Sequence, residues 1–300
     1  MAMVSVGKIL EGAFGLIRER FAAVAIWAGI YLAGNIAIAL AVQPMIGTAM
    51  DPATAGDPNA VIGATTPAFL LSILLGLIGL VLYAAAMRAV LRPDAGGVAY
   101  LRLGMDELRL LVLLILFAVV ALILWVILGF ALGLLGLGVA MGSESPLLSG
   151  LVMFVLGLIM FAVMVFFTVR FSLAFPLTLH RRQLVIGEAW TLSRGRFWTL
   201  FGAALVVTII GFVMTLAVSS FALGSYFSDL MAAAGDPAAA ERAAQAQIAN
   251  ANAFSAMMIL QSIGSSIVAG IWIALSGGSI ATAARALLDH EFDDAEAVFG

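Results

Sequence analysis

Cysteine is absent from the 300-residue chain, and histidine is limited to His180 and His290. The absence of cysteine excludes disulfide bonds, a thiolate nucleophile and metal or iron–sulfur sites with cysteine ligands. Charged residues are also scarce, at 10% of the chain against about 25% in soluble domains. With 64% hydrophobic residues and a mean hydropathy of +1.16, the composition excludes an ordinary soluble domain and predicts a polytopic membrane protein.

Long apolar runs are what the sequence has in place of charge. A hydrocarbon core of roughly 30 Å needs about 20 apolar residues per helix. Six runs meet this length and predict an all-α fold with six transmembrane helices, at about residues 21–43, 68–90, 110–139, 150–175, 199–223 and 253–277. We expect one membrane domain over residues 1–288 and a solvated acidic tail over residues 289–300.

The basic residues predict the orientation of these spans. If the chain crosses the membrane six times, all of the 14 lysine and arginine residues except Arg242 fall on one side. Basic residues accumulate in cytoplasmic connections. We therefore expect both termini to be cytoplasmic.

A short amphipathic segment that carries arginine precedes each odd-numbered span, at residues 8–21, 98–111 and 183–198. We expect these segments to be helices at the cytoplasmic interface rather than a cleavable signal. In the second segment, Arg102 and Asp106 have the i,i+4 spacing of a helical ion pair. The first segment has an apolar face, formed by Ile9, Leu10, Ala13, Phe14, Leu16 and Ile17, and a polar face with Lys8 and Glu11.

One connection on the other side of the membrane contains Asp236 followed by Pro237. An aspartate N-cap with proline at the first helical position is a typical helix start. This pair predicts a short helix over residues 237–250.

The connection HRRQLVIGEAWTLSRGRFW, residues 180–198, holds the densest group of polar side chains. One interpretation is a phosphate site in which Arg194 and Arg196 grip the anion. The other is a structural elbow, in which a helix from about residue 184 ends at a left-handed Gly195. In the second interpretation Glu188 pairs with a nearby arginine, and one helix face carries Ile186, Ala189, Trp190, Ser193 and Phe197.

The block RFSLAFPLTLHRRQLVIGEAWTLSRGRFWTLFG, residues 170–202, resembles the signature of the glycerophosphoryl diester phosphodiesterase membrane-domain family. The positions that carry the resemblance are Arg170, Phe171, Pro176, Ala189, Trp190, Leu192, Ser193, Arg194, Gly195, Phe197 and Trp198. The resemblance implies a multi-pass protein of the bacterial cytoplasmic membrane and structural roles for Arg170, Pro176, Ser193, Gly195 and Trp198. Some members are fused to a soluble phosphodiesterase domain, whereas no stretch outside these spans could hold a barrel of about 250 residues.

His180, Arg181 and Arg182 resemble the start of a phosphodiesterase catalytic site. Such a site also needs a second histidine and acidic metal ligands that converge on one pocket. We favour a basic anchor in which Arg181, Arg182, Arg194 and Arg196 face lipid headgroups, an interaction worth about 1 kcal/mol per basic side chain. No catalytic residue, metal or cofactor is predicted.

Within the spans, polar groups are few. Arg88, Arg170 and Asp229 lie at span ends, so no ionisable residue marks an ion pathway at the midplane. We expect Asn35 to form an interhelical hydrogen bond. The other polar residues at depth are Gln261, Ser262, Ser265 and Ser266, and close helix contacts are expected at Gly76, Gly79, Gly129, Gly133, Gly136, Gly264 and Gly270.

Together these observations favour a non-enzymatic integral membrane protein that acts through lipid or protein contacts in envelope maintenance. Its expected partners are membrane lipids, anionic ones above all, and other membrane proteins, with no nucleic acid. An alternative is a transporter component for a lipidic or apolar solute, which a hydrophilic cavity around Asn35 and Gln261 would favour. A lipid-modifying enzyme is the third class, with His180, Glu188 and the arginine cluster as its candidates.

The orientation can be tested with alkaline phosphatase, which is active only outside the cytoplasm. A fusion after residue 60 should be active and a fusion after residue 95 inactive, because Arg88 and Arg92 hold the second connection inside. The reverse pattern of activity would contradict the predicted topology.

Overall fold

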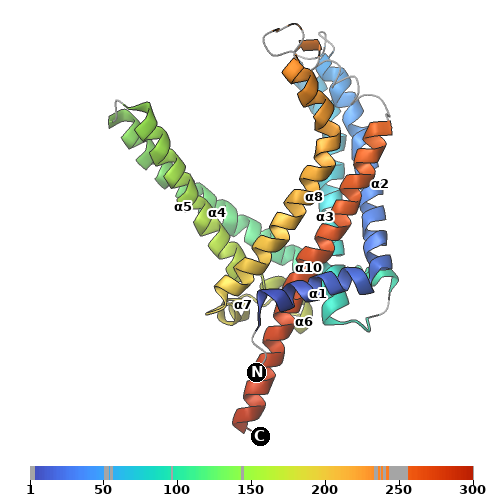
Figure 1. Cartoon of the computed structure of the whole chain (residues 1–300), viewed down its shortest axis with the longest axis vertical. Helices are drawn as coiled ribbons and strands as arrows, with labels where there is room; N and C mark the ends of the chain where they lie inside the picture. Colours follow the sequence, from blue (N-terminus) through green and yellow to red (C-terminus); the bar gives the residue numbers. More distant parts are fainter. Residues whose placement is uncertain are drawn as a thin grey trace. The chain divides into compact units, whose positions relative to one another are not determined.

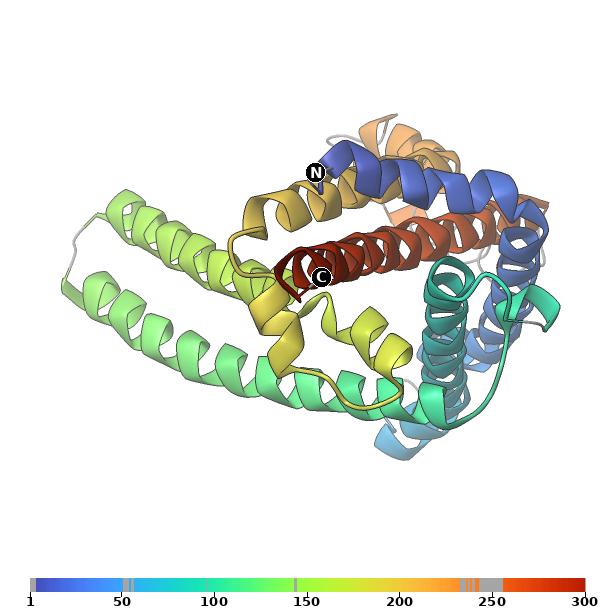
Figure 2. The ribbon, with the colours of Figure 1, turned by 90° about the horizontal axis from the view of Figure 1, so that it is seen from below.

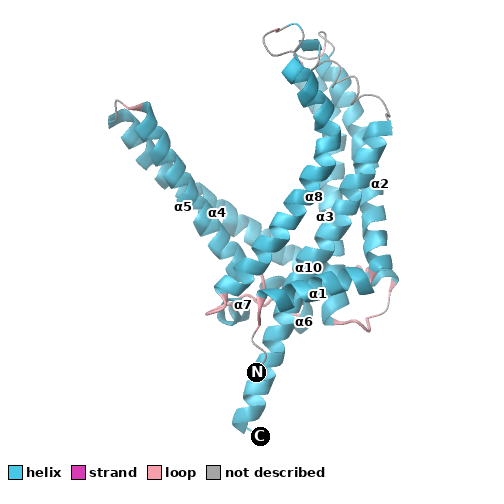
Figure 3. Ribbon diagram, viewed as in Figure 1, coloured by secondary structure: helices cyan, strands magenta, loops and turns pink. Residues whose placement is uncertain are grey.

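The computed structural model describes residues 4–50, 54, 57–95, 97–142, 145–232, 236, 238, 241–242 and 256–299. Helices occupy nearly all of these residues, and no strand occurs among them (Figure 3), which confirms the all-α prediction. In chain order (Figure 1) the elements are α1 Val6–Glu19, α2 Phe21–Met50, α3 Pro58–Leu91, the 3-10 turn η1 Val98–Tyr100, α4 Met105–Gly142, α5 Pro146–Phe171, α6 Ala174–Arg181, α7 Gly187–Leu192, α8 Phe197–Ala232 and α10 Ala256–Phe299.

Six of these helices are long and apolar enough to cross a membrane: α2, α3, α4, α5, α8 and α10. Each covers most or all of one predicted span. Large apolar side chains such as Phe130 of α4 and Phe154 of α5 point outward, which is favourable only where hydrocarbon surrounds the helix. The six helices make the chain a multi-pass membrane protein.

Two helices begin earlier than the apolar runs suggested, because capping residues start them. Asp57 is the N-cap of α3, where its side chain accepts a hydrogen bond from Asn59 N at 2.9 Å and proline follows at the first position. Ser145 caps α5 in the same way and accepts from Leu148 N at 3.4 Å. An N-cap followed by proline fixes a helix start independently of hydropathy.

The fourth predicted span, residues 150–175, lies within an apolar stretch from Leu147 to Arg181, but one continuous helix does not run through it. Helix α5 stops at Phe171, and a separate short helix, α6, starts at Ala174. Pro176 explains the break, because its ring would clash with the carbonyl of residue 172 and it has no N–H for the helix ladder. In the first turn of α6 the same proline is tolerated.

The described part of the last outer connection agrees with a capped start, since Asp236 Oδ1 accepts a hydrogen bond from Ala238 N at 3.0 Å. Most of the helix predicted over residues 237–250 lies outside the described residues. At the C-terminus, the backbone of the acidic tail continues α10 as far as Phe299.

Contacts divide the chain into two compact units. Unit 1 comprises Met1–Ile9, Leu103–Ala204 and Ile280–Gly300, and unit 2 comprises Leu10–Arg102 and Leu205–Ser279. The single domain over residues 1–288 stays a prediction. The expected faces of α1 are found in part: Ile9, Ala13 and Leu16 are buried and Lys8 and Glu11 are exposed, but Phe14 of the expected apolar face is 47% exposed.

Close helix packing in unit 2 depends on small residues. A side chain at Gly270 would meet Ala28 and the carbonyl of Val24, and one at Gly277 would meet Ala86. Of the glycines expected at contacts, Gly79, Gly136, Gly264 and Gly270 face a neighbouring side chain. Gly76, Gly129 and Gly133 face open space within the described part of the chain.

Asn35 forms the predicted interhelical hydrogen bond in unit 2. Its Nδ2 donates to Ser266 Oγ at 3.1 Å, and that hydroxyl donates to the carbonyl of Ser262 at 2.6 Å. The amide of Asn35 is therefore used to join α2 to α10.

Arg88 holds a strained loop in unit 2, a role that the sequence did not predict. Its side chain is only 2% exposed, and NH1 donates to the carbonyl of Tyr100 at 2.6 Å. The buried Trp27 donates from Nε1 to the carbonyl of Ala99 at 3.1 Å. Ala99 and Tyr100 have φ values of 52° and 61°, so the backbone is left-handed at two residues that lack glycine's freedom.

Replacing Arg88 should therefore destabilise unit 2. We expect Arg88→Met to lower the unfolding free energy by about 2 kcal/mol or more, because a charged hydrogen bond is lost and the strained carbonyl of Tyr100 loses a donor. Thermal unfolding in detergent measures the loss. The matched substitution Arg18→Met, at an exposed arginine of α1, should shift stability by less than about 0.5 kcal/mol; equal losses for the two would contradict this role for Arg88.

Candidate functional site

The most strongly basic connection in the described chain is the segment from Arg170 to Trp198, here called the basic elbow. It contains five arginines and one acidic residue, Glu188. It comprises the end of α5, the short helices α6 and α7, and the start of α8, all in unit 1. Figure 2 shows α6 and α7, in yellow, beside the ends of α4 and α5.

Helix α6 forms the buried floor of the elbow. Pro176, Leu177 and Leu179 are buried in the core of unit 1, and Arg182 ends the helix in a left-handed conformation with φ 57°. The returning chain is held onto α6, because Val185 N donates to Thr178 Oγ1 at 3.2 Å. The structural role that the family resemblance implies for Pro176 stays a prediction.

Helix α7 is shorter than predicted. It starts at Gly187 rather than near residue 184, since the N–H of Val185 is bonded to a side chain of α6. Gly195 has the expected left-handed conformation, with φ 77°, but α7 already ends at Leu192 with Ser193 as its C-cap. Ala189 and Ser193 are fully buried, and Ile186 and Phe197 pack on the same core, so the predicted face of this segment packs against protein.

Arg170 connects α5 to α7 through contacts that join three motif positions. Its guanidinium carbon lies 4.5 Å from the ring centroid of Trp190 and 5.7 Å from that of Phe166. Its NH1 donates to Ser193 Oγ at 3.2 Å, and its buried Nε has no hydrogen-bond partner among the described residues. A cation over an aromatic face is stabilised by the ring quadrupole, more so where water is excluded.

An aromatic cluster surrounds this cation. The ring of Trp190 lies 5.3 Å from that of Phe171 and 6.3 Å from that of Phe166, which itself lies 5.4 Å from Phe197. The sequence placed both tryptophans in the aromatic belt of the interface. Trp190 packs within the cluster and Trp198 is 77% exposed, and the place of both in the belt stays a prediction.

The four arginines predicted to contact headgroups differ in their contacts. Arg181 donates from NH2 to Glu188 Oε1 at 2.9 Å, which confirms that Glu188 pairs with a nearby arginine. Arg182, Arg194 and Arg196 have no ion pair among the described residues. Three guanidinium groups of the elbow are therefore free to bind an external anion.

Nothing in the described chain assembles a metal centre: no group of three or more histidine, cysteine or acidic side chains is found there. His180 is exposed at the end of α6, and the side chain of His290 lies outside the described residues. At the start of α4, Asp106 pairs with Arg109 at 2.8 Å. Arg102 precedes the start of α4 at Met105. The prediction that Arg102 and Asp106 lie on one helix was therefore wrong.

Comparisons of the chain with protein-family models, with curated proteins and with solved structures found no match. The class that the fold defines is a multi-pass membrane protein with six apolar helices. The resemblance to the glycerophosphoryl diester phosphodiesterase membrane-domain family stays a prediction that rests on the motif residues.

The two tryptophans of the elbow offer a matched test of its packing. Trp190→Ala should lower the unfolding free energy by about 3 kcal/mol, because it removes a ring from the aromatic cluster and the face on which Arg170 lies. Trp198→Ala, at an exposed site, should change it by less than about 0.5 kcal/mol in detergent. Thermal unfolding of the purified variants measures both, and a larger loss for Trp198→Ala would show that the cluster does not hold the elbow.

Proposed function

We propose that the protein is a non-enzymatic component of the bacterial cytoplasmic membrane whose basic elbow binds the headgroups of anionic lipids, in the service of envelope maintenance. Both termini and the elbow lie on the cytoplasmic side in this proposal. The distribution of basic residues over the six connections supports that orientation. The motif from Arg170 to Trp198 supports kinship with the glycerophosphoryl diester phosphodiesterase membrane-domain proteins.

The observation that carries the proposal is the set of free guanidinium groups on Arg182, Arg194 and Arg196. Arginine binds phosphate through parallel N–H donors, and each basic side chain near an anionic leaflet contributes about 1 kcal/mol. Arg181 contributes less, because Glu188 already neutralises it. Arg170 lies over the rings of Trp190 and Phe166 and acts as a structural cation.

The rigid backbone of the elbow supports the same function. Arg182 ends α6, and Gly195 turns the chain between Arg194 and Arg196. Helices α6 and α7 pack on the unit 1 core, so these arginines extend from a fixed base rather than from a loose loop. Preorganised donors lose less conformational entropy when an anion binds.

The test is the retention of anionic lipid. We expect replacement of Arg181, Arg182, Arg194 and Arg196 by glutamine to reduce the phosphatidylglycerol that co-purifies with the full chain by roughly tenfold or more, at about 1 kcal/mol for each free arginine. Native mass spectrometry with a mixture of phosphatidylglycerol and phosphatidylcholine measures the retention.

A matched control separates the elbow from general surface charge. Glutamine at Lys8, Arg18, Arg92 and Arg102 removes the same charge from other connections predicted to be cytoplasmic, and it should leave most of the phosphatidylglycerol bound. Equal retention by the elbow variant and the unmodified chain would overturn the proposal. Equal losses in the two quadruple variants would do so as well, because the elbow would then have no special affinity.

A further inference from the structure

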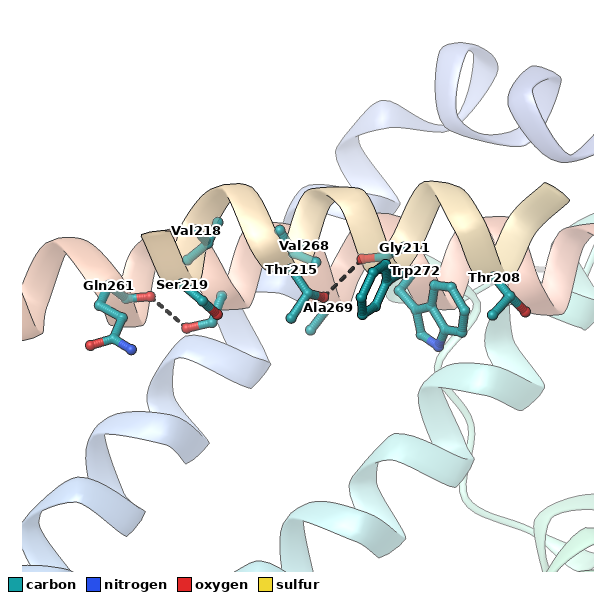
Figure 4. A pocket seen from close by; sticks show the side chains of 11 residues that line it. Thr208, Gly211, Thr215, Val218, Ser219, Gln261, Val268, Ala269 and Trp272 are labelled. Carbon is teal, nitrogen blue, oxygen red and sulfur yellow. Dashed lines mark hydrogen bonds between the residues drawn. The ribbon is translucent and has the colours of Figure 1, made fainter. Parts of the chain in front are cut away.

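A groove of about 440 Å³ lies between α8 and α10 within unit 2. Figure 4 shows the side chains that line it, which come from both helices. Gly211 of α8 lies against the ring of Trp272 and leaves the room that this ring occupies. Both helices are apolar enough to cross the membrane, so the groove lies at the depth of lipid chains.

Two polar side chains of this groove have no hydrogen-bond partner among the residues that the structure describes. Gln261 and Ser219 line it, and neither side chain has a hydrogen bond within the described chain. By contrast, Thr215 donates to the carbonyl of Gly211 at 2.8 Å and Ser265 to that of Gln261 at 2.5 Å. A ligand group that bonds to Gln261 would satisfy an amide that has no partner in the described chain.

The polarity of the groove changes along its length. Gln261 and Ser219 lie near the ends of their apolar spans, Met258–Asp289 and Phe197–Ser220. Toward Trp272 the lining becomes largely apolar and aromatic, with Phe212, Val268 and Ala269. One polar residue, Thr208, lies at the far end. From Gln261 to Trp272 a helix rises about 16 Å, which is close to half of a hydrocarbon core of roughly 30 Å.

We propose that this groove binds one acyl chain of a glycerolipid, with Gln261 and Ser219 bonded to its ester region. A polar end, an apolar remainder and the length of one leaflet match such an amphiphile. A partner transmembrane helix would instead need a contact surface along the whole span. No charged residue is among the described lining. In this proposal the site recognises the ester group and the acyl chain of the lipid and not the charge of its headgroup. It is independent of the basic elbow.

Photolabelling tests the site. The full chain is reconstituted in phosphatidylcholine vesicles that contain a phosphatidylcholine with a diazirine midway along one acyl chain. Adducts should concentrate on residues 208–219 and 261–272. Ala269→Phe fills the groove and should reduce these adducts at least threefold, whereas Ala217→Phe, at an exposed position of α8 outside the described lining, should leave them unchanged. Gln261→Leu should also reduce them, and equal thermal stability shows that each variant is folded.

Three results would overturn the proposal. Adducts spread over all six apolar helices in proportion to their exposure would show that no site exists. Unchanged labelling in Ala269→Phe would show the same for the groove. Because the chain has no cysteine, Thr215→Cys reports on a second copy: a disulfide-linked dimer formed in the membrane would show that another chain covers the groove. A labelling yield that is equal with phosphatidylglycerol probes would support a site distinct from the elbow.

Discussion

A polar group inside hydrocarbon has no water to bond, and the internal pairing of such groups organises both units of this protein. The backbone meets the requirement by forming helices that satisfy their own N–H and C=O groups. Asn35 meets it by donating to Ser266, and Arg88 by donating to the carbonyl of Tyr100. Gln261 and Ser219, near the ends of their spans, line a groove without a hydrogen bond in the described chain, and the proposed acyl-chain site rests on them.

The basic elbow shows how polar side chains are accommodated where the apolar helices end. Pro176 breaks the fourth apolar run, α6 returns over the core, and the ring of Trp190 covers the cation of Arg170. Of the remaining arginines, Arg181 pairs with Glu188, and the others lie at or beyond the turn without an ion pair in the described chain. Ser193 is buried against Arg170, although its neighbours Arg194 and Gly195 are exposed. One short segment therefore combines a structural cation with cations free for binding.

Hydropathy and capping patterns predicted much of this fold. Six helices follow from run length alone, the left-handed conformation of Gly195 from helix-termination rules, and the contact of Asn35 from the cost of an unpaired amide. The burial of Arg88 was not predictable, because its acceptor lies in a loop that is left-handed at Ala99 and Tyr100. Neither residue is a glycine, so the sequence does not indicate this conformation. The position of Trp190 over Arg170 was missed because it depends on the turn that places α7 against α5. The break before α6 could have been found from Pro176.

The most direct measurement of the central claim is the retention of phosphatidylglycerol by the single variant Glu188→Gln. The substitution releases Arg181 from its ion pair without removing any basic residue. If free guanidinium groups of the elbow bind anionic headgroups, the variant should retain more phosphatidylglycerol than the unmodified chain, and adding Arg181→Gln should restore the original amount. Retention that is unchanged or lower in Glu188→Gln would contradict the account.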